Sequence, residues 1–166
     1  MGVQKHFIPI VLLLFFLLVA REIYPYVEPL NSEVEDGFAI EKIDSGYGGP
    51  TCLEWADNSS LLMCDRDSGR ILLLDADDGF KSVALLSGLD HPHDVHLTSD
   101  HLFVSEEGQL SRYNRSNLSF SDPVVLIEGI PSGNHQTNAI NSFPNGTLIW
   151  PSGSTCNVCE QSDERN

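Results

Sequence analysis

The residues with the clearest chemical potential lie in one stretch near the C-terminal end of the chain. His135 opens the run HQTNAINSFPNGTLIW, and the pair Cys156 and Cys159 follows it as Cys-Asn-Val-Cys. A histidine titrates near neutral pH, so it suits a general base that takes a proton from a hydroxyl group. Two thiols at this spacing suit a disulfide, a redox centre or a metal site. On its own, His135 is more often a polar residue at the start of a β-strand than a catalytic base.

The four cysteines of the chain favour structural disulfides. Thioredoxin-type chemistry at Cys156 and Cys159 would need a βαβ context, which the surrounding sequence lacks. A zinc knuckle would need a second closely spaced pair, and Cys52 and Cys64 are too far apart for that. We therefore favour a disulfide between Cys156 and Cys159. Cys52 and Cys64 flank the expected turn Asp57–Ser60, so a cross-strand disulfide is allowed there if the register places both on one face.

A second group of polar residues is the segment HPHDVHLTSDH, which holds His91, His93, His96 and His101. On an extended strand His91 and His93 share a face, whereas His96 points to the other face. Four side chains arranged in this way cannot converge on one ion, so we predict no metal site among these histidines. His93 is the residue of interest, because it stands at the start of its repeat, as His135 does in the next one.

The elements that must position these residues form a loose repeat of about 42 residues. The copies begin at Pro50, Pro92 and His135. Each has a short mixed strand, a polar turn, an apolar strand and then Asp, Ser or Gly residues. The polar turns are Asp57–Ser60, Thr98–Asp100 and Pro144–Gly146, and further strands are expected at Arg70–Leu74, Val83–Leu86, Gln109–Tyr113 and Val124–Ile127. No segment after Gly49 has a convincing helical period.

Short strands in units of this length predict an all-β fold and are typical of β-propeller blades. The alternative is a β-sandwich in which the hairpins resemble one another by chance. We favour the propeller, because strand number and turn position recur together. Residues 46–166 hold about three blades, whereas a propeller closes with at least about four. We therefore expect the chain to be the N-terminal fragment of a longer protein.

The N-terminal segment, residues 1–20, is expected to be a signal peptide or signal anchor. The apolar run Phe7–Ala20 has the length of a signal-peptide core and is shorter than the ~20 residues of a membrane-spanning helix. Leu18 occupies a position where cleavage at the end of this run prefers a small residue, so both alternatives stay open. Either predicts export to the periplasm or the extracellular space, with residues 7–20 as the membrane anchor if they are retained. Residues 21–45 are expected to be an acidic tether, with one strand near Phe38–Ile43.

The charge of the chain excludes one class of partner. Nine Lys and Arg residues face 24 Asp and Glu residues, for a net charge of −15. Binding to a phosphate backbone needs clustered cations, so we expect no nucleic-acid partner.

Three stretches together resemble the soluble quinoprotein glucose dehydrogenase and sorbosone dehydrogenase family. They are GPTCLEWADNSSLLMCDRDSGRILLLDADDG, GLDHPHDVHLTSDHLFVSEEGQLSRY and GIPSGNHQTNAINSFPNGTLIWPSGSTCNVCEQSDER, of which the third is the most specific. The resemblance covers residues 46–166. It implies a six-bladed propeller that binds pyrroloquinoline quinone and calcium, with about three of the six blades in this chain.

The same resemblance implies a role for His135 as the general base that takes the proton of a sugar hydroxyl. Asn134 stands where glucose-oxidising members often have Asp, and Trp150 stands near a position where a tyrosine is common. In the family most quinone contacts and the calcium ligands lie in later blades, so we assign no cofactor-binding residue here and expect the chain alone to be inactive.

The resulting functional hypothesis is the N-terminal part of an exported quinone-dependent dehydrogenase. Its substrate would be a sugar or related aldehyde, and its other partner an electron acceptor. The alternatives are a non-catalytic propeller that binds a protein or another ligand, and a calcium-dependent lactonase-like propeller.

Overall fold

A computed structural model describes residues 34–133, 135 and 138–155 of the chain. The chain divides into two compact units, Met1–Lys42 and Ile43–Asn166, and every strand of the described residues lies in the second. The strands are β1 (Pro50–Trp55), β2 (Ser60–Asp65), β3 (Arg70–Asp75), β4 (Lys81–Ser87), β5 (Asp94–Leu97), β6 (His101–Glu106), β7 (Gln109–Ser116), β8 (Ser119–Ile127), β9 (Asn141–Ser142) and β10 (Leu148–Ile149). Two short 3₁₀ turns, Arg66–Ser68 and Ala76–Asp78, are the helical elements of the described residues. The fold of this unit is therefore all-β.

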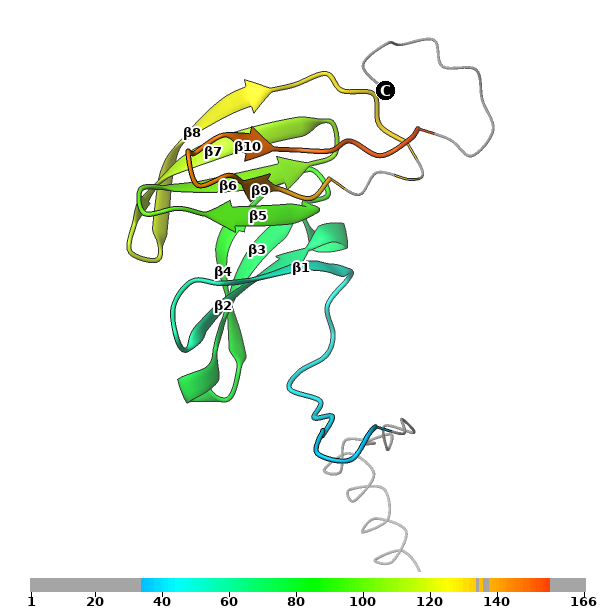
Figure 1. The fold of residues 1–166 in the computed structure, drawn as a ribbon, viewed down its shortest axis with the longest axis vertical. Coiled ribbons are helices and arrows are strands. Elements are labelled where there is room, and N and C mark those ends of the chain that lie inside the picture. The colour runs from blue at the N-terminus through cyan, green and yellow to red at the C-terminus, as the bar shows by residue number, and fades with distance from the viewer. Residues whose placement is uncertain (1–33, 134, 136–137, 156–166) are drawn as a thin grey trace, which may run out of the picture. The chain divides into compact units, whose positions relative to one another are not determined.

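The strands form three antiparallel sheets, none of which is closed (Figure 1). The first sheet has the order β1-β2-β3-β4 and the second the order β5-β6-β7-β8, so each is a meander of sequential strands. The third is the short hairpin of β9 and β10. Short polar turns produce this order, because an antiparallel neighbour can be reached through a few residues whereas a parallel one cannot.

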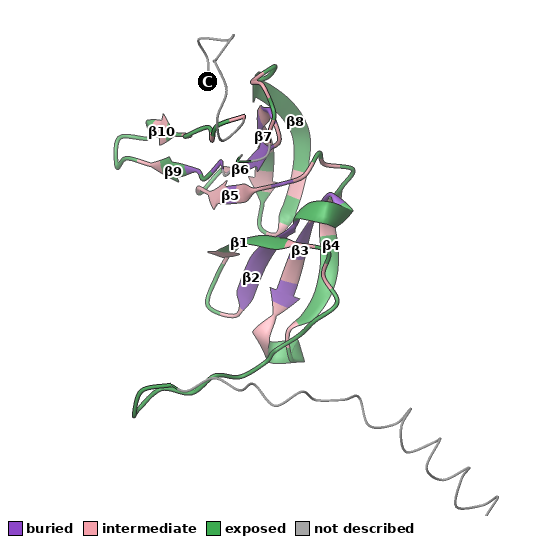
Figure 2. Cartoon of the chain, turned by 90° about the vertical axis from the view of Figure 1, so that its right-hand side faces the viewer, coloured by how far each residue is buried: buried purple, intermediate pink, exposed green. Residues whose placement is uncertain are grey.

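The burial of each strand follows its place in the meander. All six residues of β2 are buried, as expected for an apolar strand that is covered on both faces. The outer strands β4 and β8 are mostly exposed (Figure 2). The inner strands of each sheet therefore supply most of the core, and the outer strands supply its surface.

The two large sheets share a hydrogen-bonding pattern that repeats about every 42 residues. Asp65 ends β2 and Glu106 ends β6, and both residues are buried. Asp65 accepts a hydrogen bond from the backbone N–H of Gly48, just before β1, at 2.8 Å. Glu106 accepts one from the backbone N–H of Asp90, before β5, also at 2.8 Å. A buried carboxylate thus fixes the incoming chain in both copies.

A glycine fixes the outgoing chain in the same two places. Gly69 precedes β3 with φ of 62°, and Gly108 precedes β7 with φ of 75°. Their carbonyl groups accept hydrogen bonds from the N–H groups of Leu89 and Ile130, which follow β4 and β8. A Cβ atom on Gly69 would collide with the carbonyl oxygen of Leu89, and one on Gly108 with that of Ile130. The sequence repeat is therefore a repeat of structure.

The first and second sheets share one apolar core. Its buried residues are Cys52, Leu62, Cys64, Ile71, Val95, Leu102 and Val104, which come from both sheets. Strand β1 lies beside β5, and the Thr51 hydroxyl donates a hydrogen bond to the carbonyl oxygen of Pro92 at 2.8 Å. The third hairpin contacts the second sheet, where Trp150 Nε1 donates to Ser105 Oγ at 2.7 Å. Consecutive copies of the repeat are thus spatial neighbours.

Most of the strand predictions are confirmed. The four further strands of the first two copies fall within β3, β4, β7 and β8, and the three polar turns join β1 to β2, β5 to β6 and β9 to β10. The strand expected near Phe38–Ile43 is wrong, because these residues pair with no other described strand. Phe38 instead closes a turn onto Glu35, and its side chain is 73% exposed. An extended segment becomes a strand only when a neighbour completes its hydrogen bonds.

The expected disulfide between Cys52 and Cys64 is confirmed, and the two residues lie directly opposite each other in β1 and β2. Disulfides are typical of proteins in oxidising compartments. Cys156, Cys159 and the expected signal or anchor of residues 1–20 lie outside the described residues. Within the described residues no helix is long and apolar enough to cross a membrane.

Candidate functional site

A small pocket lies where the three copies of the repeat begin. It has a volume of about 240 Å³ and is lined by Thr51, His93, Asp94, Asn138 and Ala139. Thr51 belongs to β1, Asp94 is the first residue of β5, and Asn138 precedes β9. Each copy therefore contributes polar groups from its first strand or from the residues just before it. The sequence repeat predicted a special position for His93, and the structure places it in this pocket.

The carboxylate of Asp94 is held in a fixed orientation. Its Oδ1 accepts a hydrogen bond from the N–H of Val95 at 2.9 Å, and its Oδ2 accepts one from the N–H of Ile140 at 2.7 Å. The second bond joins the second copy of the repeat to the third. Asp94 therefore positions the chain that carries Asn138 as well as lining the pocket.

Asn138 is fixed in a similar way and is 1% exposed. Its Nδ2 donates to the carbonyl oxygen of Glu106 at 3.4 Å, and its Oδ1 accepts from the N–H of Gly153 at 3.3 Å. A buried amide with partners on two segments has a defined direction. The side chains of Asp94 and Asn138 in the pocket are therefore both oriented by hydrogen bonds to the backbone.

His93 is partly buried, and charged side chains lie near it. Burial, together with the positive charge of Arg66, holds the pKa of His93 below its ordinary value of 6.5. The carboxylate of Glu107 opposes that shift, and His91 adds to it. A lowered pKa keeps the imidazole neutral near pH 7, so that one ring nitrogen can accept a hydrogen bond and the other can donate one.

His135 lies three residues before Asn138, and the structure gives it a position at the start of the third copy. It forms an isolated antiparallel bridge with Ser154 and is exposed. The chain comes very close to itself next to this bridge, because a Cβ atom on Gly133 would overlap the backbone of Thr155. His135 is not among the residues found to line the pocket. The structure thus brings His93, Asp94 and Asn138 together in one pocket. His135 is close to Asn138 in the sequence but does not line that pocket.

His96 and His101 contact different neighbours. His96 Nε2 lies 2.9 Å from Ser142 Oγ, and the ring of His101 lies 6.0 Å from that of Phe103. These two histidines thus have different neighbours in the structure. His91 instead lies beside Asp90 and Glu107, and these are the one group of three potential metal ligands among the described residues.

Sequence reasoning missed Asp94, Asn138, Asp90 and Glu107. Asp94 had a usable signal, since it follows His93 at the start of a copy. Asn138 and Glu107 had none, because their partners lie far away in the sequence and only the folded sheets bring them together.

The chemistry available in the pocket is that of neutral and anionic hydrogen-bonding groups. Its polar lining comprises a hydroxyl, an imidazole, a carboxylate and an amide, and it contains no Lys or Arg among the described residues. Such groups suit several hydroxyl groups of one ligand, which both donate and accept hydrogen bonds. They do not suit a polycarboxylate, which needs cationic partners.

No protein-family model matches the chain, and no curated protein is significantly similar to it. The residues of the site therefore carry the functional argument.

Proposed function

We propose that the chain is part of an exported quinone-dependent dehydrogenase that oxidises a sugar or a related aldehyde, with His135 as the general base. The observation that supports a substrate site most is the pocket formed by the starts of three successive repeats, whereas the role of His135, which does not line it, rests on the family resemblance. In a β-propeller the first strand of each blade lines the central channel, so a ligand in that channel would meet these same positions. The six-bladed propeller remains part of the proposal.

The pocket residues favour a polyhydroxylated ligand. Asp94 and Asn138 are oriented by hydrogen bonds to the backbone, and His93 is favoured in its neutral form. We assign to His93, Asp94 and Asn138 the binding of substrate hydroxyl groups. Preorganised groups of this kind lose little conformational entropy when a ligand binds.

The quinone does not fit this pocket. Pyrroloquinoline quinone carries carboxylates, and no described lining residue is a cation. The proposal therefore assigns neither quinone nor calcium contacts to the described residues, and we derive no step through them. The role of His135 is to take the proton of the reacting hydroxyl group, which an imidazole does efficiently near neutral pH.

The substrate class can be tested by dye reduction. The protein expressed from the complete locus is supplied with pyrroloquinoline quinone and Ca²⁺, and then with aldoses, aldehydes and simple alcohols. The proposal expects dye reduction with at least one aldose or sugar-derived aldehyde, and none when the quinone is omitted. Hydrolysis of lactones without dye reduction would favour the lactonase-like alternative. Ligand binding without turnover of any substrate would favour a binding propeller.

A further inference from the structure

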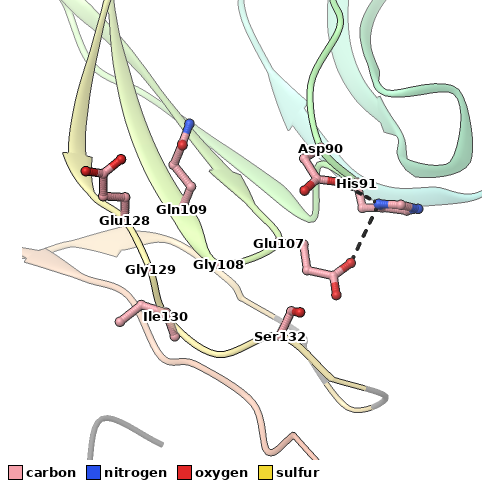
Figure 3. Close-up of a pocket in the computed structure, with 9 residues that line it drawn as sticks. All are labelled: Asp90, His91, Glu107, Gly108, Gln109, Glu128, Gly129, Ile130 and Ser132. Atoms are coloured by element: carbon pink, nitrogen blue, oxygen red, sulfur yellow. Dashed lines mark hydrogen bonds and ion pairs between the residues drawn. The ribbon is translucent and has the colours of Figure 1, made fainter.

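Three potential metal ligands converge beside a second, larger pocket (Figure 3). His91 Nδ1 lies 2.8 Å from Asp90 Oδ1 and 3.6 Å from Glu107 Oε2. Asp90 and His91 precede β5, whereas Glu107 lies in the turn between β6 and β7. The pocket has a volume of about 450 Å³, and its wall also includes Glu128. The turn and the incoming chain thus present one nitrogen and two oxygens to the same point.

The hydrogen bonds that recur in both copies use the backbone of Asp90, and its side chain is left to contact His91. Asp90 uses its backbone for the structure: its N–H donates to Glu106, and its carbonyl oxygen accepts from the N–H of Glu107 at 2.9 Å. The first copy makes the same two kinds of bond through Gly48 and Gly49. In that copy glycines therefore make the bonds that the backbone of Asp90 makes in the second copy.

The residue of the first copy that corresponds to Glu107 is not a potential metal ligand either. Arg66 donates its N–H to Gly49, as Glu107 does to Asp90, so Arg66 stands where the second copy has Glu107. Glycine and arginine in the first copy thus stand where the second copy has Asp90 and Glu107. Because both copies make these bonds through backbone groups, the side chains of Asp90 and Glu107 are not used for them, although the backbone differs at His91, whose φ is 45°.

We propose that Asp90, His91 and Glu107 bind a divalent transition-metal ion of the Zn²⁺ class. Metal–ligand bonds of about 2.1 Å place neighbouring ligand atoms roughly 3.0–3.4 Å apart in octahedral or tetrahedral geometry. The distances of 2.8 and 3.6 Å from His91 Nδ1 lie on either side of that interval, and all three ligand atoms lie within 4.8 Å of one another, so side-chain movement would complete the site. The imidazole selects against Ca²⁺ and Mg²⁺, which prefer sites made only of oxygen.

Charge and exposure agree with this assignment. Two carboxylates close together repel each other, and a divalent cation between them removes that repulsion. The side chains of Asp90, His91 and Glu107 are 72%, 45% and 27% exposed, so an ion can enter from solvent. With three protein ligands, the remaining coordination positions would be open to water.

The test is titration of the full chain with ZnCl₂ by calorimetry after removal of metal with a chelator. We expect one Zn²⁺ ion per chain. His91→Ala, Asp90→Asn and Glu107→Gln should each weaken binding at least about tenfold, since even residues that only support metal ligands cost 10–100-fold. His101→Ala is the matched control, because it removes a nearby histidine outside the cluster and should leave the affinity unchanged.

Two further measurements test whether these three side chains themselves hold the ion. Circular dichroism in the presence of chelator must show that each variant melts like the wild type, and Glu107→Gln, the mildest change, serves if His91→Ala does not fold. A Cys156→Ser/Cys159→Ser variant tests whether thiols bind the ion instead. The proposal would be overturned by absence of saturable binding to the wild type, by wild-type affinity in all three cluster variants, or by loss of binding only in the cysteine variant. The outcome of this test does not depend on whether the protein is a dehydrogenase.

Discussion

The buried carboxylate of Asp65 should contribute to stability through its charge. Its side chain is fully buried, and it accepts a hydrogen bond from Arg70 at 2.6 Å and one from the N–H of Gly48 at 2.8 Å. Burial alone would raise the pKa of Asp65, but the hydrogen bonds from Arg70, Ser68 and Gly48 and the charge of Arg70 together hold the pKa below 3.8. The folded protein therefore favours the ionised form.

Replacement of Asp65 by Asn keeps the size of the side chain and removes its charge. Loss of one partner of a fully buried ion pair costs about 3–5 kcal/mol. The side chain of Arg70 is 40% exposed and stays partly solvated, so we expect a smaller cost, roughly 2–3 kcal/mol. The free energy of unfolding is measured by urea denaturation, followed by tryptophan fluorescence.

Two controls identify the charge as the cause. In an Arg70→Gln background, Asp65→Asn should cost at least about 1 kcal/mol less than in the wild type, because the ion pair is already absent. The contribution of the ionised carboxylate is fully present above pH 3.8 and is lost as the pH falls through the lower pKa of the folded state, so the two proteins should converge in acid. An equal cost in both backgrounds, or a difference that does not change with pH, would refute this reasoning.

Three further predictions concern the disulfide, the pocket and the turns. Replacing Cys52 and Cys64 by Ala opens a short loop and should lower stability by roughly 3 kcal/mol, measured by urea denaturation; an unchanged midpoint would contradict a stabilising role. Because burial lowers the pKa of His93, the unfolded state binds the proton first as the pH falls below 6.5; stability should drop there, and His93→Gln should flatten that drop in thermal melts. Gly108→Ala should destabilise more than Gly146→Ala. Both glycines have positive φ, but only at Gly108 would a Cβ atom meet a carbonyl oxygen, at 2.7 Å, so the reverse order in denaturation would count against the close packing described for Gly108.

Much of the fold was predictable because the signals are local. Alternation of apolar and polar residues with polar turns identifies the strands of the first two copies, and the near-equal spacing of Pro50, Pro92 and His135 identifies the repeat. Phe38–Ile43 carries a similar local pattern and forms no strand. The strands of the repeats have neighbouring strands to hydrogen-bond with, whereas Phe38–Ile43 has none among the described residues, and a local sequence pattern does not reveal such partners.

The candidate sites were predictable only in part. His93 could be found because its position within the repeat is special. Asp90 and Glu107 are 17 positions apart in sequence and meet only because β6 returns beside the start of β5. The closely spaced histidines of residues 91–101 therefore did not predict that His91 would lie beside two carboxylates, one of them from a distant turn. The register between strands, which sets such meetings, depends on long-range packing.

The central functional claim is that His135 is the base of a dehydrogenase, and the most direct measurement is the rate of dye reduction by His135→Ala. The assay uses the protein from the complete locus, with quinone loading matched to the wild type and a sugar that the wild type oxidises. Loss of a general base predicts a fall in kcat of about 10²–10⁴-fold with little change in quinone loading. A variant that retains the wild-type kcat would contradict the assignment of His135.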